Sequence, residues 1–241
     1  MCTLSIIAPA PGTFVLAFNR DERPHRGERA PAIATGVRRV AMPSEIQSGG
    51  SWIAANDAGL AFALLNRNEP GVPDGGSDGP SRAEIVPHVA HAADLDEARR
   101  LLGEVVGRIH RGYRLVVTDG QRVLEAVGGS GAAEFRIEPL VRPFMRASSG
   151  LGDALVSGPR AELFESTVAR LAPPLLEGAQ RAFHMHRWND RRELSVLMDR
   201  REARTVSHTT IRVGTQRIEF AHRMRDGDGF APWTSLELAR A

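Results

Sequence analysis

Cys2 is the residue whose type and position most directly suggest covalent chemistry. A small residue after Met1 usually permits removal of the methionine, and Cys2 would then carry a free α-amine beside its thiol. These groups have ordinary pKa values of about 7.7–8.0 and about 8.5, so the thiol proton passes to the amine at little cost near neutral pH. A cysteine at this position is therefore predicted to be a nucleophile that carries its own base.

The polar string Asn19-Arg20-Asp21-Glu22 lies within reach of Cys2 if the first segments form a hairpin. Residues 3–8 and 13–18 have the composition of β-strands, and the proline- and glycine-rich residues between them mark a turn. Antiparallel pairing about that turn puts Cys2 opposite position 19, 20 or 21. The sequence thus predicts one thiol facing one polar cluster.

Three members of the string are candidate catalytic residues with Cys2. Arg20 would favour the thiolate, and Asp21 and Asn19 would orient the ammonium group. Each also has a structural alternative. Cys2 could be a small buried residue at a strand start, Arg20 and Asp21 an ion pair that locks the hairpin, and Asn19 a side chain that bonds a turn.

A second hairpin is predicted from residues 52–55 and 60–65, which flank a turn at 56–59. The same register arithmetic brings Asn66 near Gly49, where it could donate to an oxyanion as a further catalytic residue. Trp52 is a candidate substrate platform, with core packing as the alternative. Ser207, in a strand pattern near the end of the chain, is a candidate to face the pocket.

Together, Cys2, the string at 19–22, Gly49-Gly50-Ser51-Trp52 and Asn66-Arg67 resemble the NRDE family, also called the transport and Golgi organisation protein 2 family. The resemblance spans nearly the whole chain. It implies a single domain over residues 1–241 with an N-terminal-nucleophile (Ntn) hydrolase-like fold, a four-layer αββα sandwich with antiparallel sheets.

The start of the chain is also similar to bile-salt hydrolases and penicillin V acylases, which cleave amides through an N-terminal cysteine. The shared features are the Met-Cys-Thr opening and an Asn-x-Asp at positions 19–21. The chain differs at Phe18, where those acylases have arginine, and at Ser148-Ser149, where many relatives have Ser-Asn. On this resemblance we place Arg67 and Ser149 with Trp52 and Ser207 as candidate substrate-binding residues.

The remaining segments predict the elements that would position such a site. A capping box at 81–84 starts a short helix, and a clearer helix runs from about residue 94 to 109 with one apolar face. A third hairpin at 114–126, a helix at 159–171 and a meander of strands at 194–198, 205–213 and 216–220 follow. This order indicates an antiparallel α+β architecture rather than a regular βαβ repeat.

Composition limits the classes of function. The formal charge is +2, and all 31 basic residues are arginine. Since acidic residues interleave the densest basic stretch, 187–204, we expect a solvated surface there and no nucleic-acid partner, with a ligand bearing acyl or phosphate groups as the alternative.

One cysteine excludes an intrachain disulfide, no segment has the length of a membrane span, and a cytoplasmic location is expected. We expect no cofactor and no metal, because the pair His184 and His186 lacks partner ligands.

Two hypotheses of function follow from these residues. The first is an amidohydrolase or acyl-transfer protein that acts on a non-peptide C–N (amide) bond of a small molecule through Cys2. The second is a binding or trafficking protein for a hydrophobic ligand such as acyl-CoA, a lipid or haem, with little or no turnover.

Overall fold

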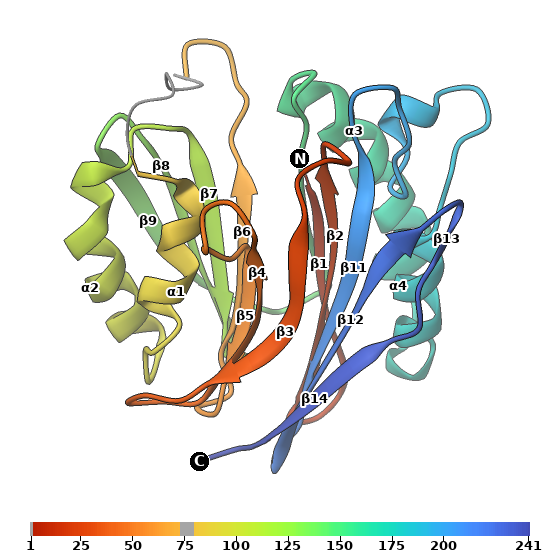
Figure 1. Ribbon diagram of the computed structural model, residues 1–241. Helices are drawn as coiled ribbons and strands as arrows, with labels where there is room; N and C mark the ends of the chain where they lie inside the picture. Colours follow the sequence, from red (N-terminus) through yellow and green to blue (C-terminus); the bar gives the residue numbers. More distant parts are fainter. Residues whose placement is uncertain (1, 73–79) are drawn as a thin grey trace.

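Two antiparallel sheets lie face to face, with helices on both outer faces (Figure 1). The computed structural model describes residues 2–72 and 80–241. The first sheet has the order β10-β1-β2-β11-β12, and β13 and β14 both pair with β12. Its strands are β1 (Cys2–Ala10), β2 (Thr13–Glu22), β10 (Phe144–Ser148), β11 (Arg204–Val213), β12 (Arg217–Asp226), β13 (Gly229–Phe230) and β14 (Thr234–Ala239).

The second sheet is a meander in which every strand pairs with the next one along the chain, in the order β3 to β9. Its strands are β3 (Glu28–Ala34), β4 (Val40–Glu45), β5 (Ile53–Asn56), β6 (Ala61–Asn66), β7 (Tyr113–Thr118), β8 (Arg122–Gly129) and β9 (Ala132–Pro139). The three predicted hairpins are all present as pairs β1 and β2, β5 and β6, and β7 and β8.

Helices α1 (Ile85–Val89) and α2 (Leu95–Val105) cover the second sheet, and α3 (Asp153–Phe164) and α4 (Leu176–His184) cover the first (Figure 1). The predicted α+β fold with four αββα layers is confirmed. Short 3₁₀ or π turns occupy Arg82–Glu84, Val106–Arg108, Glu165–Ala169, Pro173–Leu175 and Arg192–Leu194. Within the described ranges, no helix has both the length and the apolar character that crossing a membrane requires.

Alternation along the strands sends side chains into separate layers of the core. In β1, Leu4 and Ile6 face the second sheet, whereas Ile7 packs with Phe164 and Phe183 of the outer helical layer. The polar residues Thr3 and Ser5 lie on the same helix-facing side of β1, fully buried. Buried polar groups need hydrogen-bond partners, so this side of the sheet must supply them from the helices.

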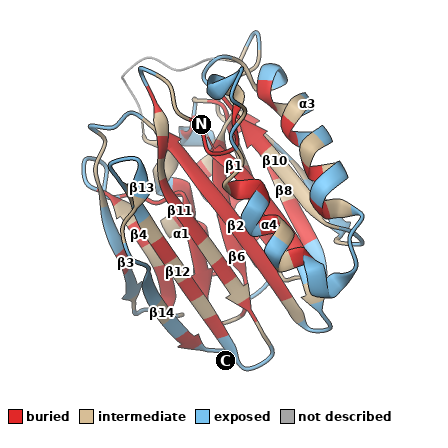
Figure 2. Ribbon diagram, turned by 90° about the vertical axis from the view of Figure 1, so that its right-hand side faces the viewer, coloured by how far each residue is buried: buried red, intermediate tan, exposed pale blue. Residues whose placement is uncertain are grey.

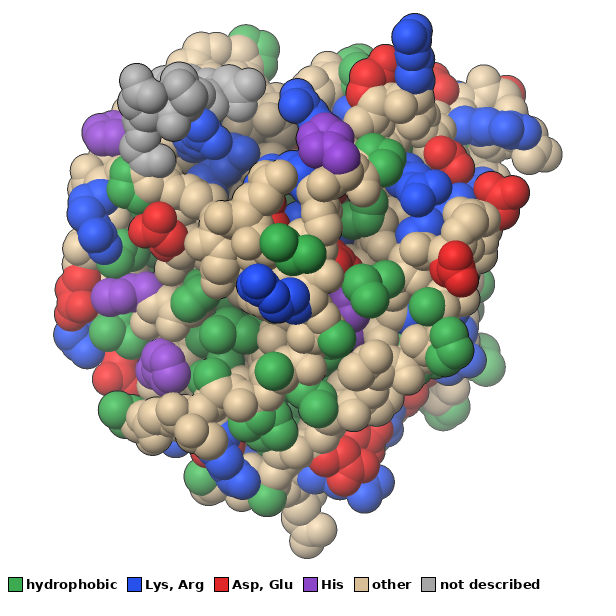
Figure 3. Space-filling model, in the orientation of Figure 1, with side chains coloured by type: hydrophobic (Ala, Val, Ile, Leu, Met, Phe, Trp, Pro, Cys, Tyr) green, Lys and Arg blue, Asp and Glu red, His purple; other side chains and the backbone are tan. Residues whose placement is uncertain are grey.

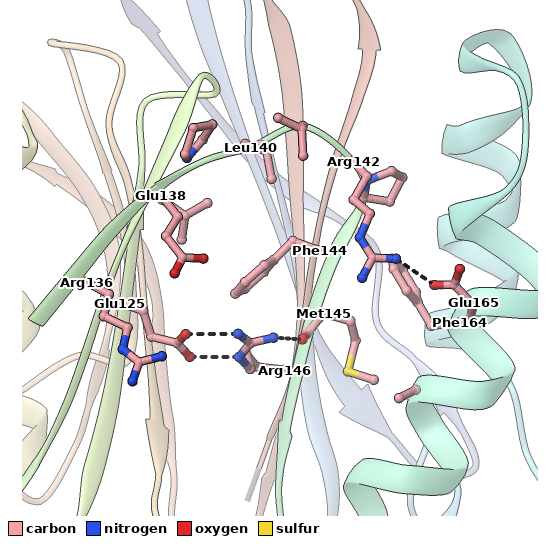
Figure 4. Close-up of a pocket in the computed structure, with 15 residues that line it drawn as sticks. Glu125, Arg136, Glu138, Leu140, Arg142, Phe144, Met145, Arg146, Phe164 and Glu165 are labelled. Atoms are coloured by element: carbon pink, nitrogen blue, oxygen red, sulfur yellow. Dashed lines mark hydrogen bonds and ion pairs between the residues drawn. The ribbon is translucent and has the colours of Figure 1, made fainter. Parts of the chain in front are cut away.

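A half-buried ion pair joins the two sheets beside the crossover from β9 to β10 (Figure 4). Arg146 on β10 donates from Nε and Nη2 to Oε1 and Oε2 of Glu125 on β8, at 2.7 and 2.9 Å. Burial would raise the pKa of the Glu125 carboxyl, but these bonds hold it below its ordinary value. The guanidinium carbon of Arg146 also lies over the Phe144 ring, 4.2 Å from its centroid. The paired charges thus close this side of the sandwich.

Two predicted elements differ from the structure. Helix α3 begins at Asp153, six residues before Pro159, because the Asp153 carboxylate accepts bonds from the backbone N–H groups of Asn68 and Ser149 and fixes an earlier start. Residues 194–198 form no strand. Val196, Leu197 and Met198 are buried. Leu197 bonds to the backbone of His186 and Met198 to that of Thr205 in β11, and these single bonds do not continue into a strand, a case that an apolar run alone does not distinguish.

Helix α2 offers a direct test of local stability. Asp94 is its N-cap, and the side chain accepts from the Glu97 N–H at 2.8 Å. Asp94→Ala should lower the free energy of unfolding by about 1 kcal/mol, because that N–H loses its partner. Asp96→Ala removes the same charge from the first turn without a capping bond and should cost only a few tenths. Urea unfolding of both variants checks the difference, and equal losses would contradict it.

Candidate active site

Cys2 begins β1 on the side of the first sheet that faces the second. Its Cα partners are Arg20 on β2 and Ser148 on β10, so the predicted juxtaposition with the polar string is confirmed for Arg20. The residue is 6% exposed and belongs to the core between the sheets. Burial raises the pKa of the Cys2 thiol, and the charge of Arg20 opposes part of that rise. The thiol therefore needs a base to ionise near neutral pH.

Arg20 is fixed beside Cys2 by two contacts. Its Nη1 donates to Oε2 of Glu28 at 2.7 Å, and both side chains are almost fully buried. Its guanidinium carbon lies 4.1 Å from the centroid of the Trp52 ring. A guanidinium stacked on an indole and paired with a carboxylate keeps one orientation, so Arg20 offers a fixed positive charge near the sulfur.

Glu28 is the centre of a buried network that sequence reasoning did not identify. Its Oε2 also accepts from the Ser207 hydroxyl at 3.1 Å, and its Oε1 lies 3.0 Å from Nε2 of His222. Burial would raise the pKa of Glu28, but the bond to His222 and the charge of Arg20 hold it below its ordinary value. Ser207, predicted to contact substrate, thus supports the partner of Arg20.

Asp21 lies beside Cys2 with one carboxylate oxygen that has no hydrogen-bond partner among the described residues. Its Oδ1 accepts from the Thr205 hydroxyl at 2.7 Å, whereas the buried Oδ2 accepts none from residues 2–72 and 80–241. Burial raises the pKa of Asp21, and the nearby charge of Arg160 offsets only part of this rise. A buried carboxylate oxygen without a donor is costly, which suits a site that receives a cation.

Arg160 on α3 is the second residue that sequence reasoning missed. It is 1% exposed, and its Nη1 lies 3.8 Å from Oδ2 of Asp21. Its guanidinium donates to the Thr3 hydroxyl at 2.7 Å and to the backbone oxygens of Leu194 and Ser195 at 3.0 and 2.7 Å. Burial lowers the pKa of Arg160 and the charge of Asp21 opposes this. The helix therefore holds a charge next to the start of β1.

Asn19 does not join this group. It lies on the helix-facing side of β2, where its amide donates to the backbone oxygens of His184 and Val196 at 2.8 and 3.0 Å. Its Oδ1 contacts Nδ1 of His208 at 2.7 Å and of His184 at 3.1 Å. Burial lowers the pKa of His184 to about 3 and that of His208 well below its ordinary value, so both imidazoles are neutral. The Asn19 side chain therefore has a structural role, in which its hydrogen bonds join β2 to β11 and to α4.

A small pocket of about 90 Å³ opens over Cys2 between the two sheets. Asn66, at the end of β6, lines it together with Cys2, Arg20, Asp21 and Trp52. The mouth of this pocket also carries several charged side chains. Glu22, Arg26, Glu45, Arg82 and Arg111 contribute to its walls. The structure thus gathers five of the predicted site residues around one opening, with Trp52 serving also as the platform for Arg20.

Arg67 and Ser149 lie outside the lining of this pocket. Arg67 donates from Nε to Glu69 at 2.9 Å, and the Ser149 N–H donates to Asp153 at the start of α3. Ser148, one position earlier, is the residue paired with Cys2, and its hydroxyl is buried without a hydrogen-bond partner among the described residues. The serine paired with Cys2 in the sheet is therefore Ser148 rather than Ser149.

No group of three or more His, Cys, Asp or Glu side chains in residues 2–72 and 80–241 is arranged to hold a metal ion. The two closest histidines, His184 and His208, share the Asn19 amide oxygen, with their ring centroids 5.3 Å apart. The pocket over Cys2 is lined by carboxylate, guanidinium and amide groups, among them those of Asp21, Arg20 and Asn66.

Two solved structures with a similar fold are hydrolases. The C2A mutant of conjugated bile acid hydrolase from Clostridium perfringens matches with a TM-score of 0.58 over 99% of this chain and 92% of that chain, at 10% sequence identity. The Caenorhabditis elegans ortholog of N-acylethanolamine-hydrolyzing acid amidase matches with a TM-score of 0.55 over 87% of this chain and 92% of that chain, also at 10% identity. The fold is accordingly Ntn-hydrolase-like, as the sequence resemblance implied.

Sequence comparison identifies the family. No curated protein matches the chain. The family model described as Transport and Golgi organisation 2 matches residues 1–136, more than half of the 241 residues. The matched part includes Cys2, the string at 19–22 and Asn66, which carried the resemblance. The chain belongs to the Transport and Golgi organisation 2 family.

Proposed function

We propose that this protein is a cysteine-type amidohydrolase or acyl-transfer enzyme that acts on a non-peptide C–N bond through Cys2. One observation carries the proposal. Cys2, Arg20 and Asp21 border one pocket at the start of β1, and the buried Oδ2 of Asp21 has no hydrogen-bond partner in residues 2–72 and 80–241. Removal of Met1 would place an α-ammonium beside that carboxylate, which would supply the missing donor.

The proposed reaction uses the α-amine of Cys2 as base. The amine accepts the thiol proton, and the thiolate attacks the amide carbon to form a tetrahedral intermediate. The Asn66 amide is the proposed donor to the resulting oxyanion. The C–N bond then breaks as the α-ammonium protonates the leaving amine, which leaves an acyl group on sulfur. Water, deprotonated by the same amine, hydrolyses the thioester and restores Cys2.

The surrounding residues have supporting roles in this proposal. Asp21 orients the α-amine and stabilises its charged form, and the charge of Arg160 favours the ionised form of the Asp21 carboxyl against the effect of burial. Arg20 lowers the cost of the thiolate, while Glu28 and Trp52 hold Arg20 in place. Since the space over Cys2 is about 90 Å³, the acyl portion nearest the bond must be small, with the rest of the substrate reaching the charged mouth.

Covalent labelling tests the proposal. Protein that begins at Cys2 is treated with a p-nitrophenyl ester and with a β-lactam, and the adduct is located by peptide mass spectrometry. We expect one acyl group per chain on Cys2 and none on Cys2→Ala. The test is specific because the chain has a single cysteine. Equal labelling of both proteins, or none of either with amide, lactam and ester probes, would refute an acylating Cys2.

The burial of the thiol supports a second candidate function, the binding or trafficking of a hydrophobic ligand. Cys2 is 6% exposed and the pKa of its thiol is raised by burial, which disfavours attack in a chain that retains its amino-terminal methionine. A carrier predicts saturable binding of a fluorescent fatty acyl probe with equal affinity in the parent protein and Cys2→Ala. Hydrolysis of acyl probes without any such binding would rule out the carrier.

A further inference from the structure

A second cavity, of about 570 Å³, lies on the outer face of the first sheet beside α4. It is on the opposite side of that sheet from Cys2. Figure 2 shows that α3 and α4 lie over one part of this sheet and leave the outer face of β12 and β14 without a covering helix. His208, Arg223 and Trp233 line the cavity, with Arg181 of α4 at its edge. Its position makes it independent of the pocket over Cys2.

The charges around this cavity do not balance. Its two carboxylates are already paired, since Glu177 accepts from Arg212 at 2.5 Å and Glu219 lies 3.0 Å from Arg217. Arg181 and Arg223 form no ion pair with any residue in the described part of the chain. Burial, and then the charge of Arg181, lowers the pKa of Arg223. Two cations that repel each other at one cavity indicate a place for an anion.

Arg223 is also held in a geometry that suits anion binding. Its guanidinium carbon lies 4.3 Å from the Phe230 ring centroid and 4.4 Å from that of Trp233. Its Nη2 contacts the weak acceptor Sδ of Met185 at 3.3 Å, and its Nε is buried without a partner among the described residues. Rings against a guanidinium restrict its rotation and leave its N–H groups at the edge, where a carboxylate or phosphate binds.

We propose that this cavity binds a small molecule with a carboxylate or phosphate head, held by Arg223 and Arg181, and with a flat apolar part that lies against Trp233. The Trp233 side chain is 43% exposed, which leaves ring surface for that part. Thr210 and Ser235 border the cavity, and their hydroxyls add donors for the head. The site is a binding site separate from Cys2, and it requires no acylation.

Calorimetric titration of the full chain at low ionic strength tests this site. The probes are phenyl phosphate and phenylacetate, which distinguish the two heads, inorganic phosphate, which lacks the ring, and neutral benzyl alcohol. At least one aromatic anion should bind saturably, more tightly than inorganic phosphate and benzyl alcohol. Arg223→Met should weaken that binding by about tenfold or more, because one charge-assisted contact is lost.

Three variants decide between this site and general attraction to a basic protein. Arg100→Met removes an equal charge from the exposed face of α2, which covers the other sheet, and should change affinity less than about twofold. Arg181→Met alters an exposed side chain and should weaken binding several-fold without affecting the fold. Trp233→Ala should weaken the aromatic anion more than inorganic phosphate. Equal effects of Arg223→Met and Arg100→Met, equal binding of benzyl alcohol, or no saturation below about 10 mM overturns the proposal.

Discussion

A chain that begins at Cys2 should be acylated about 10²–10⁴ times faster than the same chain with one glycine ahead of Cys2, because the added residue converts the basic α-amine into an amide. Burial raises the pKa of the Cys2 thiol, so the blocked chain has little thiolate near neutral pH. Both proteins are obtained from fusions cleaved at defined positions. The measurement is the single-turnover release of p-nitrophenol at pH 7, with the first residue verified by intact mass.

The pH dependence separates the amine from other causes of slow acylation. Thiolate increases as pH rises, so the blocked chain should gain rate continuously toward alkaline pH and approach the free chain there. Asp21→Asn in the free chain keeps the size of the side chain but removes its charge, and it should slow acylation at pH 7 by weakening the hold on the ammonium. Equal rates for free and blocked chains at pH 7 would show that Cys2 does not use its own amine.

The placement of Cys2 opposite Arg20 was predictable because it depends on a local hairpin. Two apolar runs with a proline- and glycine-rich turn between them leave little freedom of register. The strand register changes by one position along the hairpin. Next to the turn Ala10 pairs with Thr13, at the far end Cys2 pairs with Arg20, and the shift falls at an irregularity between Ile7 and Ala10. The sequence could therefore place the partner of Cys2 only within the three positions 19 to 21.

The alternation of side chains along a strand explains why the prediction that Asn19 lies beside Cys2 was wrong. Successive side chains of a strand point to opposite faces, so Asn19 and Arg20 cannot both face the thiol. Asn19 points to α4 and bonds with His184 and Val196. Asp21 also points to the helical layer, toward Arg160, yet it borders Cys2 because it lies where β1 begins and where the pairing of β2 with β11 is irregular. The two-residue period of a strand, applied to β2, places Asn19 and Arg20 on opposite faces of the sheet.

Arg160 and Glu28 were not predictable from the sequence for a different reason. Arg160 reaches Thr3 across 157 positions, and Glu28 reaches His222 across 194. No local pattern links such positions, and arginines are so frequent in this chain that a single one carries little information. The helix predicted at 159–171 contains Arg160, but the sequence did not indicate that this charged side chain would be buried beneath the helix. These contacts follow from the stacking of layers, which only the structure specifies.

Arg160→Met should lower the free energy of unfolding by about 3–5 kcal/mol, because the buried Asp21 carboxylate loses its nearby opposite charge. Three oxygens, on Thr3, Leu194 and Ser195, lose their donors as well. Methionine preserves most of the apolar volume, so the loss reports on charge and hydrogen bonding. The measurement is urea unfolding at pH 7 of a chain with the same first residue in every variant.

The control for Arg160→Met is Arg170→Met, which removes an exposed arginine that lies 3.8 Å from Glu165, and it should cost less than about 0.5 kcal/mol.

The pH dependence of stability gives a second test. The folded-state pKa of Asp21 is raised above its ordinary value of 3.8, so Asp21 destabilises the folded chain as pH rises from the ordinary pKa through the folded-state pKa. Arg160→Met should enlarge the effect, and the variant should recover stability relative to the parent as pH falls and Asp21 becomes protonated. Adding Asp21→Asn should restore part of the loss at pH 7, since no buried charge then lacks a partner. If the two arginine variants unfold alike, Arg160 does not balance the charge of Asp21, and its place in the proposed site is lost.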